Sequence, residues 1–474
     1  MGIVAVVGAG NGGLAVAGLL ASRGHEVRVT DRNPEVVEPI ARAGAIEVTG
    51  KIQGRGPVAL ATTDVAAAVR GAPVVMVVVP GNAHGAVAEA LAPSVSDGQV
   101  IVLHPGGAGG ALEFAATFAR LGVRARPLLA EVESFTYGSK TVGPARTQIN
   151  TIKLRNRVAA LPARDTGAVL AALRDDFPQF VPARTVLETS LNHMNAMLHV
   201  ATMVMNAGWI EATKGDFEFY RDGLSPAVAR MIEAVDAERI AVSTALGAGA
   251  LPLREWIKET YGVEGPTLYE TMQTLNATVY KTSKAPASLA SRYLTEDVPT
   301  GLVPIAALGA AAGAAVPLIR LLVDLASRIH GVDYWESGRT LAKMGLAGRL
   351  GADIVRIVED DWPEAGRAIM TQMDLRMATG VERGRPLHIT MDGQELLAYQ
   401  GESVAAALFA AGRRATRATL RAGEPRGYFC GMGVCQDCLV TVDDQPNVRA
   451  CMTSVRDGLR VATQRGWGQE EAGR

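Results

Sequence analysis

The four cysteines of this chain lie together in a pattern typical of metal ligands. No cysteine occurs from Met1 to Phe429, after which the chain contains Cys430, Cys435, Cys438 and Cys451. A secreted disulfide protein spreads its bridges through the fold, so one tight group in a long chain indicates a metal ion or cluster. The spacing Cys-x4-Cys-x2-Cys matches the first three ligands of a plant-type [2Fe-2S] cluster. Structural zinc is the alternative, although zinc ribbons usually contain two Cys-x2-Cys pairs and this segment contains one.

A glycine-rich loop near the N-terminus has the spacing of a dinucleotide-binding turn. Gly8, Gly10 and Gly13, with Asn11 and Gly12 between them, separate an apolar strand from an expected helix. In such a turn the first glycine permits a tight bend, the second lets the backbone approach a pyrophosphate, and the third allows close contact between helix and strand. The phosphate then meets the free N–H groups at the start of the helix. The alternative is that these glycines serve only a turn.

The pair Asp31-Arg32 bears on which dinucleotide is bound. Asp31 ends the second expected strand, at the distance where a carboxylate binds the adenosine ribose 2′-hydroxyl. This favours NAD, because the carboxylate repels a 2′-phosphate. Arg32 leaves NADP open, since an arginine there accommodates that phosphate.

A polar stripe runs along a helix predicted over Leu191–Ile210. Its members recur at spacings of 3, 4, 3 and 4 residues, which places them on one helical face: Asn192, Asn195, His199, Thr202 and Asn206. The other positions are mostly apolar, so the stripe is expected to line a cleft in which an imidazole exchanges protons near neutral pH. The alternative is a core histidine, the interpretation we give to His193, which lies off the stripe.

A second group of candidates follows in the segment Arg292–Pro299. Arg292 has the guanidinium geometry that clamps a carboxylate, and Asp297 could orient a histidine and stabilise its charged form. Five residues apart, the two would diverge on a regular helix, so a shared site requires an irregular backbone there. A surface run of ion pairs at a helix end is the alternative.

These residues need a scaffold, and the first part of the chain predicts a parallel sheet. Apolar strands are expected at Gly2–Val7, His25–Thr30, Pro73–Val79 and Gln99–Leu103, with helices such as Leu14–Ser22 and Ala83–Leu91 between them. Continuous apolar strands separated by helices indicate a parallel sheet covered on both faces. We therefore expect an α/β Rossmann dinucleotide-binding domain over residues 1–184.

After residue 184 the sequence pattern changes several times, and each change marks an expected domain boundary. An all-α substrate domain is expected over residues 185–348, a connector with some helix over 349–384, and short strands with one helix near Ser403–Ala411 over 385–465. Residues 466–474 are expected to form a polar tail. Gly301–Ile319 contains no charged residue and is long enough to cross a bilayer, but its Ala, Gly and Pro content favours an interior helix.

Composition excludes several classes of partner. The 474 residues have a formal net charge of -1 and a pI near 6.7, which gives no electrostatic footprint for nucleic acid or an anionic membrane. The start of the chain lacks the basic region and cleavage site of a signal peptide. We expect a cytoplasmic protein, and a homo-oligomer remains open.

About three quarters of the chain, up to Gly348, resembles the octopine/nopaline family of opine dehydrogenases. The segments that carry the resemblance are Gly8–Gly13, Ala130-Glu131 with Tyr137, Asn195–His199, Phe219–Gly223 with Ser225-Pro226, Asp236 with Glu238-Arg239, Arg292–Gly301 and Gly338–Leu341. Val200 is a departure, because the family often has proline after the histidine.

This resemblance implies a reaction and roles for residues. The family joins an α-keto acid to the amine of an amino acid by reductive condensation, or reverses that reaction. His199 is then the proton donor and acceptor at the reacting carbon, paired with Asp297, and Arg292 binds the keto-acid carboxylate. Glu131, Tyr137 and Asn195 are further candidates for substrate contact.

Residues Pro386–Gln464 resemble the small iron–sulfur subunits of flavin-linked amine, opine and cyanide-forming dehydrogenases. The gap of twelve residues between Cys438 and Cys451 is shorter than in plant ferredoxins and fits these subunits. The resemblance implies a small α+β ferredoxin-like (β-grasp) domain. A nicotinamide transfers two electrons together whereas a [2Fe-2S] centre accepts one, so a flavin is the expected intermediary. Since one dinucleotide fingerprint is visible, we expect a separate FAD flavoprotein partner.

Three functions stay open on the sequence. The first is an NAD(P)-dependent opine dehydrogenase, the second is one subunit of a flavin-linked opine oxidase, and the third is a non-catalytic electron-transfer scaffold.

Overall fold

The computed structural model describes the chain except for residues 1, 281–282, 362–375, 377–382, 420–424 and 465–474. It divides into two units, Met1–Gly366 and Arg367–Arg474, each with its own hydrophobic core. Much of the expected connector and the expected tail at 466–474 lie outside the described residues.

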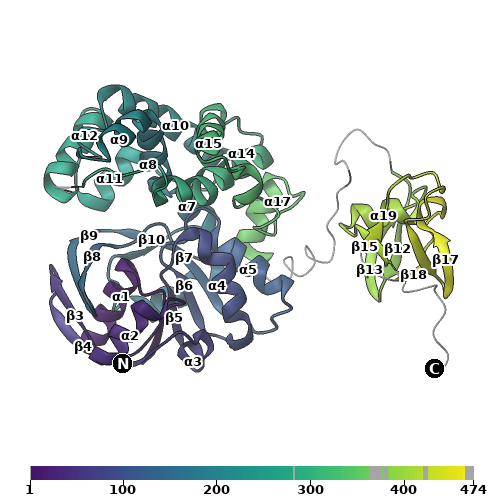
Figure 1. Ribbon diagram of the computed structural model, residues 1–474, viewed down its shortest axis with the longest axis horizontal. Helices are drawn as coiled ribbons and strands as arrows, with labels where there is room; N and C mark the ends of the chain where they lie inside the picture. The colour runs from purple at the N-terminus through teal and green to yellow at the C-terminus, as the bar shows by residue number, and fades with distance from the viewer. Residues whose placement is uncertain (1, 281–282, 362–375, 377–382, 420–424, 465–474) are drawn as a thin grey trace. The chain divides into compact units, whose positions relative to one another are not determined.

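The first unit is built on one mixed sheet (Figure 1). Its strands, in spatial order, are β11 (Phe180–Pro182), β10 (Asn156–Leu161), β7 (Leu128–Val132), β6 (Val100–Leu103), β5 (Val74–Val77), β1 (Ile3–Val7), β2 (Glu26–Thr30), β4 (Gly54–Thr62), β3 (Ala45–Gly50), β9 (Arg146–Ile152) and β8 (Tyr137–Gly143). Strands β7, β6, β5, β1, β2 and β4 run parallel. The Rossmann prediction is confirmed, and the four strands predicted from apolar runs all lie at the centre of this sheet.

The edges of the sheet were not predicted. Strands β3 and β4 form an antiparallel hairpin, as do β8 and β9, and β9 joins β3 in parallel. Strands β4 and β8 have few buried residues and no regular alternation, so their apolar pattern is too weak to be recognised without the partner strand.

Helices link the strands of this lobe. They are α1 (Asn11–Ser22), α2 (Pro34–Ala43), α3 (Val65–Val69), α4 (His84–Leu91), α5 (Gly110–Arg120) and α6 (Thr166–Leu173). The Ala-rich helices predicted before Ser22 and Leu91 are therefore present as α1 and α4.

A helical lobe follows, drawn above the sheet in Figure 1. It contains α7 (Val186–Leu191), α8 (Met194–Met205), α9 (Ala207–Thr213), α10 (Pro226–Ala245), α11 (Leu253–Tyr261), α12 (Leu268–Leu275), α13 (Arg292–Thr295), α14 (Val303–Ala312), α15 (Pro317–His330), α16 (Tyr334–Ser337) and α17 (Gly351–Arg356). The π-helical turns η4 (Asn276–Tyr280), η5 (Val298–Leu302) and η6 (Ile357–Asp361) follow α12, α13 and α17.

The single helix predicted over Leu191–Ile210 is wrong in its boundaries. The chain breaks between α7 and α8 at Asn192 and His193, and again at Asn206. Tertiary bonds fix the first break: Arg239 donates to the carbonyl of Leu191, and the side chain of Asn192 accepts from the N–H of Leu251 at 2.9 Å.

The uncharged segment Gly301–Ile319 is divided between η5, α14 and the start of α15. Among the residues that the structure describes, no helix is long and apolar enough to cross a membrane.

The second unit is a small sheet covered by one helix. Its five-stranded sheet has the order β13 (Gln394–Tyr399), β12 (Pro386–Met391), β18 (Arg460–Thr463), β16 (Leu439–Val442) and β17 (Gln445–Arg449). The first and last strands, β12 and β18, pair in parallel at its centre. Helix α19 (Val404–Ala410) contributes to the core, and β14 (Ala415–Ala418) pairs with β15 (Pro425–Gly427) before the cysteine loop. The predicted small α+β domain is confirmed.

Candidate functional site

The glycine loop between β1 and α1 leaves room for a ligand at one place and none elsewhere. Gly8 has a φ of +98°, and a Cβ there would lie 2.3 Å from the carbonyl oxygen of Val78. A Cβ on Gly13 would lie 1.8 Å from the carbonyl oxygen of Gly8. In front of Gly10, by contrast, no atom lies within 4 Å of the Cβ position. The loop is thus packed against the sheet on one side and open on the other, as a pyrophosphate site requires.

Helix α1 begins at this opening without a side-chain cap. Gly10 is its N-cap residue and has no side chain to accept from the first N–H groups of the helix. Asn11 instead turns its side chain to β8, where Oδ1 accepts from the N–H of Thr141 at 3.0 Å. The uncapped N–H groups and the helix dipole fit the phosphates of NAD(P).

Asp31 lies next to this loop at the end of β2. Its Oδ2 accepts from the N–H of Ala9 at 2.8 Å, and its Oδ1 accepts from the N–H of Asn33 at 3.0 Å. The side chain is therefore fixed beside the glycine turn, where a ribose 2′-hydroxyl would lie. Arg32 is exposed.

Replacing Asp31 with asparagine is expected to raise the preference for NADPH relative to NADH by about tenfold, about 1.4 kcal/mol, because the neutral amide no longer repels a 2′-phosphate. The measurement is the ratio of kcat/KM for the two cofactors. Glu35→Gln, an exposed carboxylate in the first turn of α2, is the matched control. An unchanged ratio in Asp31→Asn would show that Asp31 does not contact the ribose.

His199 and Asp297 form a buried pair in the helical lobe. Nδ1 of His199 lies 2.6 Å from Oδ2 of Asp297, and both side chains are almost fully buried. His193 lies 3.3 Å from the other oxygen, Oδ1. Burial alone would raise the pKa of Asp297, but the positive charge of His199 and the contacts with both imidazoles hold it well below its ordinary value. Asp297 is thus a carboxylate that keeps a proton on Nδ1 of His199.

The segment that carries Asp297 also contacts the sheet lobe. Glu296 Oε1 accepts from the N–H of Gly81 at 3.0 Å, and the carbonyl of Thr300 accepts from the N–H of Ala108 at 3.0 Å. Gly81 follows β5 and Ala108 follows β6, so both lie beyond the carboxyl ends of parallel strands. The dinucleotide site lies at that same edge. The backbone here is irregular as expected, because α13 ends at Thr295 and η5 begins at Val298.

Arg292 and Asn195 lie on α13 and α8, the helices that carry Tyr293 and His199. Arg292 is exposed at the start of α13, and its positive charge affects the hydroxyl of Tyr293, whose ring stacks on His199 with centroids 3.8 Å apart. Asn195 lies one turn before His199 on α8 and is partly exposed. Two other residues of the stripe form hydrogen bonds with the backbone. Thr202 donates to the carbonyl of Leu198, and Asn206 donates to the carbonyl of Gly223.

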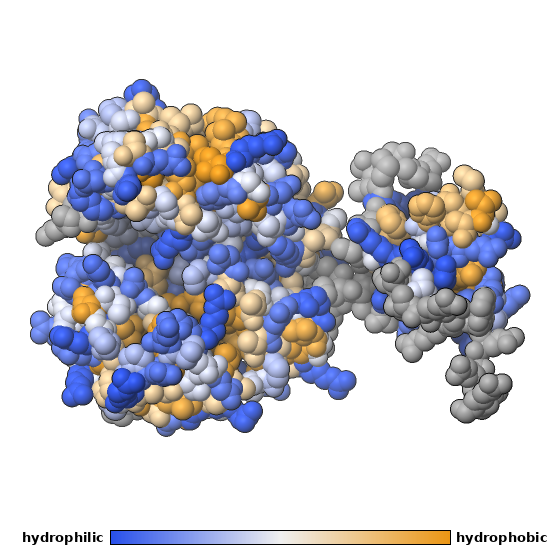
Figure 2. Space-filling view, viewed as in Figure 1, coloured by the Kyte–Doolittle hydropathy of each residue, from blue (hydrophilic) through white to orange (hydrophobic). Residues whose placement is uncertain are grey.

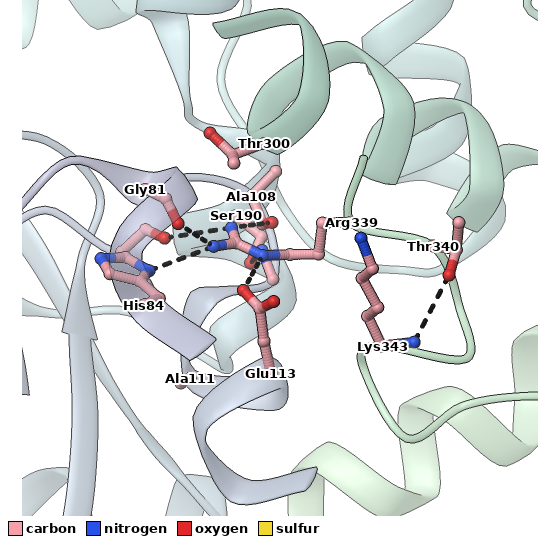
Figure 3. A network of polar contacts seen from close by, with 12 residues as sticks. Gly81, His84, Ala108, Ala111, Glu113, Ser190, Thr300, Arg339, Thr340 and Lys343 are labelled. Atoms are coloured by element: carbon pink, nitrogen blue, oxygen red, sulfur yellow. Dashed lines mark hydrogen bonds and ion pairs between the residues drawn. The ribbon is translucent and has the colours of Figure 1, made fainter. Parts of the chain in front are cut away.

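Arg339 ties the helical lobe to the loops that follow β5 and β6 (Figure 3). Its side chain is 2% exposed and donates to Glu113 Oε2 at 2.7 Å, to the carbonyl of Ala108 at 2.7 Å and to the carbonyl of Gly81 at 2.8 Å. Nδ1 of His84 accepts a further bond at 3.1 Å. Burial, and then the charge of Arg339, lower the pKa of His84 well below its ordinary value, so that the ring stays neutral and can accept.

Replacing Arg339 with methionine is expected to lower the free energy of unfolding of the first unit by about 3–5 kcal/mol, because it leaves Glu113 and the loop carbonyls without their buried donor. Urea unfolding followed by circular dichroism measures this loss. In the control, Arg320→Met, an exposed arginine over the ring of Trp335 is removed, and we expect a loss of about 1 kcal/mol or less. Equal losses in the two variants would contradict this role of Arg339.

Two further sequence candidates, Glu131 and Tyr137, make contacts within the sheet lobe. Glu131 is fully buried; its Oε2 accepts from the N–H of Ala111 at 2.8 Å, and its Oε1 accepts from the hydroxyls of Thr189 and Ser190 at 2.6 and 2.9 Å. It holds the start of α5 rather than a substrate. Tyr137 belongs to the hydrophobic core of the sheet lobe and packs edge-on against Phe135. The packing thus gives both residues a structural role, and their contact with a substrate stays a prediction.

Two residues at the site were not predicted. Tyr220 places its hydroxyl 2.6 Å from Nε2 of His199, and His193, taken as structural, touches the catalytic candidate Asp297. Tyr220 comes from the loop between α9 and α10, and no spacing rule connects it to His199, which lies twenty-one residues earlier. Its place in the segment Phe219–Gly223, quoted for the resemblance, was the available signal.

In the second unit the four cysteines fall into two pairs. Cys430 interacts with Cys435, and Cys438 interacts with Cys451. A [2Fe-2S] cluster needs this arrangement, since each iron takes two thiolates, whereas a zinc ion draws all four sulfurs to one point.

The cysteine loop favours the thiolate form of one of the four cysteines, Cys430. Backbone N–H groups of Cys435 and Met432, together with the Cys435 thiol, lower the pKa of Cys430 to about 6, whereas burial raises the pKa of Cys438. Gly433, with a φ of +77°, keeps the loop free of a side chain where Met452 approaches. The residues present thus fit a [2Fe-2S] cluster held by all four cysteines.

A Rossmann lobe, a helical lobe and a histidine–aspartate pair at the nucleotide edge define an NAD(P)-dependent dehydrogenase. Residues 3–110 match the family described as NAD-dependent glycerol-3-phosphate dehydrogenase N-terminus, and residues 182–330 match NAD/NADP octopine/nopaline dehydrogenase, alpha-helical domain. The opine dehydrogenase of Arthrobacter sp. (strain 1C) is 37% identical over 356 residues, covering 75% of this chain and 98% of that protein. The chain belongs to the opine dehydrogenase family, and it is an NAD(P)-dependent oxidoreductase that acts on CH–NH bonds.

Solved structures agree on the fold. The octopine dehydrogenase complex with NADH and L-arginine matches with a TM-score of 0.61 at 23% identity, covering 75% of this chain and 98% of that one. Yersinopine dehydrogenase with NADP+ matches with a TM-score of 0.59 at 15% identity, covering 76% and 98%.

The C-terminal unit has relatives of its own. Residues 384–466 match the family described as 2Fe-2S iron-sulfur cluster binding domain. The hydrogen cyanide synthase subunit HcnA of Pseudomonas aeruginosa is 47% identical over 76 residues, covering 16% of this chain and 72% of that protein. The predicted fusion of an opine dehydrogenase with a [2Fe-2S] module is confirmed.

Proposed function

We propose that this enzyme joins an α-keto acid to the amine of an amino acid by reductive condensation, or oxidises the product in reverse. The observation that carries the proposal is the position of Asp297: it holds His199 at 2.6 Å while its neighbours Glu296 and Thr300 bond to the loops that follow β5 and β6. A proton-exchanging imidazole is thereby fixed at the edge of the sheet where the nicotinamide binds.

Each residue of this site has one task in the proposed reaction. His199 gives or takes the proton at the reacting centre, and Asp297 fixes its tautomer and stabilises the imidazolium. Arg292, exposed at the start of α13, binds the keto-acid carboxylate through its guanidinium. Asn195, partly exposed one turn away from His199, contacts the substrates. When bound, the nicotinamide supplies or receives the hydride.

The test is an assay with NADH, pyruvate and a panel of amino acids. The proposal is supported if the absorbance of NADH falls only when both the keto acid and an amino acid are present. Oxidation of the opine by an artificial electron acceptor, without any reaction of NADH, supports the alternative of a flavin-linked oxidase subunit. A purified protein that binds NADH and carries out neither reaction is a non-catalytic scaffold.

We further propose that the cluster passes electrons to a separate FAD flavoprotein. Every exposed large hydrophobic residue in the described part of the second unit lies near the cysteine loop: Phe409, Tyr428, Phe429, Met432, Val434 and Met452. Phe429 and Val434 are 77% and 73% exposed. Figure 2 shows the apolar colour gathered on one part of this unit. Apolar residues concentrated around a redox centre suit a docking partner, and a flavin converts hydride transfer into one-electron steps.

Purification of the native protein under anaerobic conditions tests this partner. A flavin-containing subunit that co-purifies, and that is lost with Phe429→Ser, supports the proposal. Full activity in a preparation that lacks any flavin subunit, or self-association through the same residues, contradicts it.

A further inference from the structure

Both ring nitrogens of His199 are engaged, which leaves neither free for a substrate. Nδ1 lies 2.6 Å from Asp297 and Nε2 lies 2.6 Å from the hydroxyl of Tyr220. The ring of Tyr293 covers one face of the imidazole, with centroids 3.8 Å apart and planes 17° apart. Since Asp297 occupies Nδ1 as a permanent carboxylate partner, the proton that His199 exchanges is the one on Nε2. That proton faces Tyr220.

Tyr220 is held at this position by an aromatic cluster. Its ring packs edge-on against Phe219 at 5.0 Å and stacks on Tyr280 at 4.7 Å, and its side chain is almost fully buried. The hydroxyl of Tyr293 also interacts with that of Tyr220. The hydroxyl of Tyr220 therefore has a fixed place between His199 and Tyr293 rather than one of several rotamers.

The chemistry of this hydroxyl matches both charge states of the histidine. Burial, and then the nearby Tyr293 and Tyr280, raise the pKa of Tyr220 well above its ordinary value, so the hydroxyl keeps its proton. A neutral tyrosine has one O–H donor and acceptor lone pairs. It therefore donates to Nε2 when His199 is neutral and accepts from Nε2–H when His199 is an imidazolium.

We propose that Tyr220 relays the proton between Nε2 of His199 and the substrate atom that gains or loses it. In the reductive direction the O–H bond of Tyr220 breaks as an N–H bond forms on the substrate. In the same step the Nε2–H bond of His199 breaks and the O–H bond of Tyr220 forms again. The imidazolium becomes a neutral imidazole with its proton on Nδ1, and the positive charge moves to the substrate. Oxidation runs the same two transfers in reverse. This inference rests on the proposed function.

The test compares Tyr220→Phe with Tyr280→Phe. Both variants remove one hydroxyl from the same aromatic cluster, but the hydroxyl of Tyr280 lies 3.3 Å from that of Tyr261 and does not contact His199. We expect Tyr220→Phe to lower kcat by ~10²-fold with little change in the KM of the keto acid, and Tyr280→Phe to stay within about twofold of the wild type. The relay moves two protons at once, so the solvent deuterium isotope effect on kcat should fall to that of a single transfer in Tyr220→Phe only.

A measurement without cofactor or substrate keeps the two proposals apart. The ¹⁵N resonance of Nε2 in neutral His199 should move towards that of an unbonded imidazole nitrogen in Tyr220→Phe and stay unchanged in Tyr280→Phe. If this shift occurs but the wild type condenses no keto acid with any amine, the contact exists and the proposed function is wrong. If the wild type turns over and Tyr220→Phe keeps its kcat and isotope effect, or if both variants lose activity equally, the relay is wrong.

Discussion

Replacing His199 with asparagine is expected to lower kcat for the condensation by ~10³-fold, because the variant loses the group that exchanges a proton at the reacting centre. NADH binding should be unchanged, since the glycine loop and Asp31 lie in the other lobe of the first unit. Stopped-flow measurement of NADH oxidation, together with the quenching of protein fluorescence by NADH, separates the two quantities.

His193→Asn is the matched control for this variant. His193 contacts the same carboxylate at 3.3 Å but has no hydroxyl partner like Tyr220. Its loss should cost about tenfold in kcat, the ~1.4 kcal/mol of one contact to a charged group. Comparable losses in the two variants would mean that the fold around Asp297, and not proton exchange at His199, accounts for the effect.

Replacing Cys435 with serine is expected to abolish the visible absorption of the [2Fe-2S] cluster and the matching electron paramagnetic resonance signal of the reduced protein. Cys435 pairs with Cys430, so its loss removes half of the thiolates of one iron. The first unit has its own core and should keep its unfolding midpoint and its NADH oxidation with keto acid and amine.

Met432→Leu serves as the control, because it changes an exposed side chain of the same loop and keeps all four sulfurs. If Cys435→Ser retained the absorption, a ligand other than this cysteine would hold the iron. If it instead lost NADH oxidation by the first unit, the two redox centres would depend on each other for turnover.

The elements closest to the chemistry were predictable because they carry strong local patterns. The strand that ends at Val7, the loop from Gly8 to Gly13 and the cysteine spacing each need particular residue types over a few positions. His199 and Asp297 were found from an apolar helix with a polar stripe and from a family resemblance, and the structure brings them within 2.6 Å.

What could not be predicted depends on contacts between distant segments. The break at Asn192 is fixed by Arg239 on α10 and by Leu251 in the loop before α11. Glu131 resembles a ligand residue in sequence, yet its two oxygens are taken by Ala111, Thr189 and Ser190. Tyr220 reaches His199 only because an aromatic cluster folds its loop onto α8. Such pairings leave no periodic signal in the sequence. Each partner fits its own helix, strand or loop equally well whether or not the distant contact forms.

The short stretch from Glu296 to Thr300 is bonded to both lobes, through Gly81 and Ala108 on one side and through His199 on the other. Any hinge motion that admits a substrate must therefore turn about this stretch or break its bonds. Because His199 and Asp297 both lie in the helical lobe, a movement of one lobe against the other leaves the bond between imidazole and carboxylate intact. The proton-exchanging pair is therefore assembled within one lobe, and it is already formed without a bound substrate.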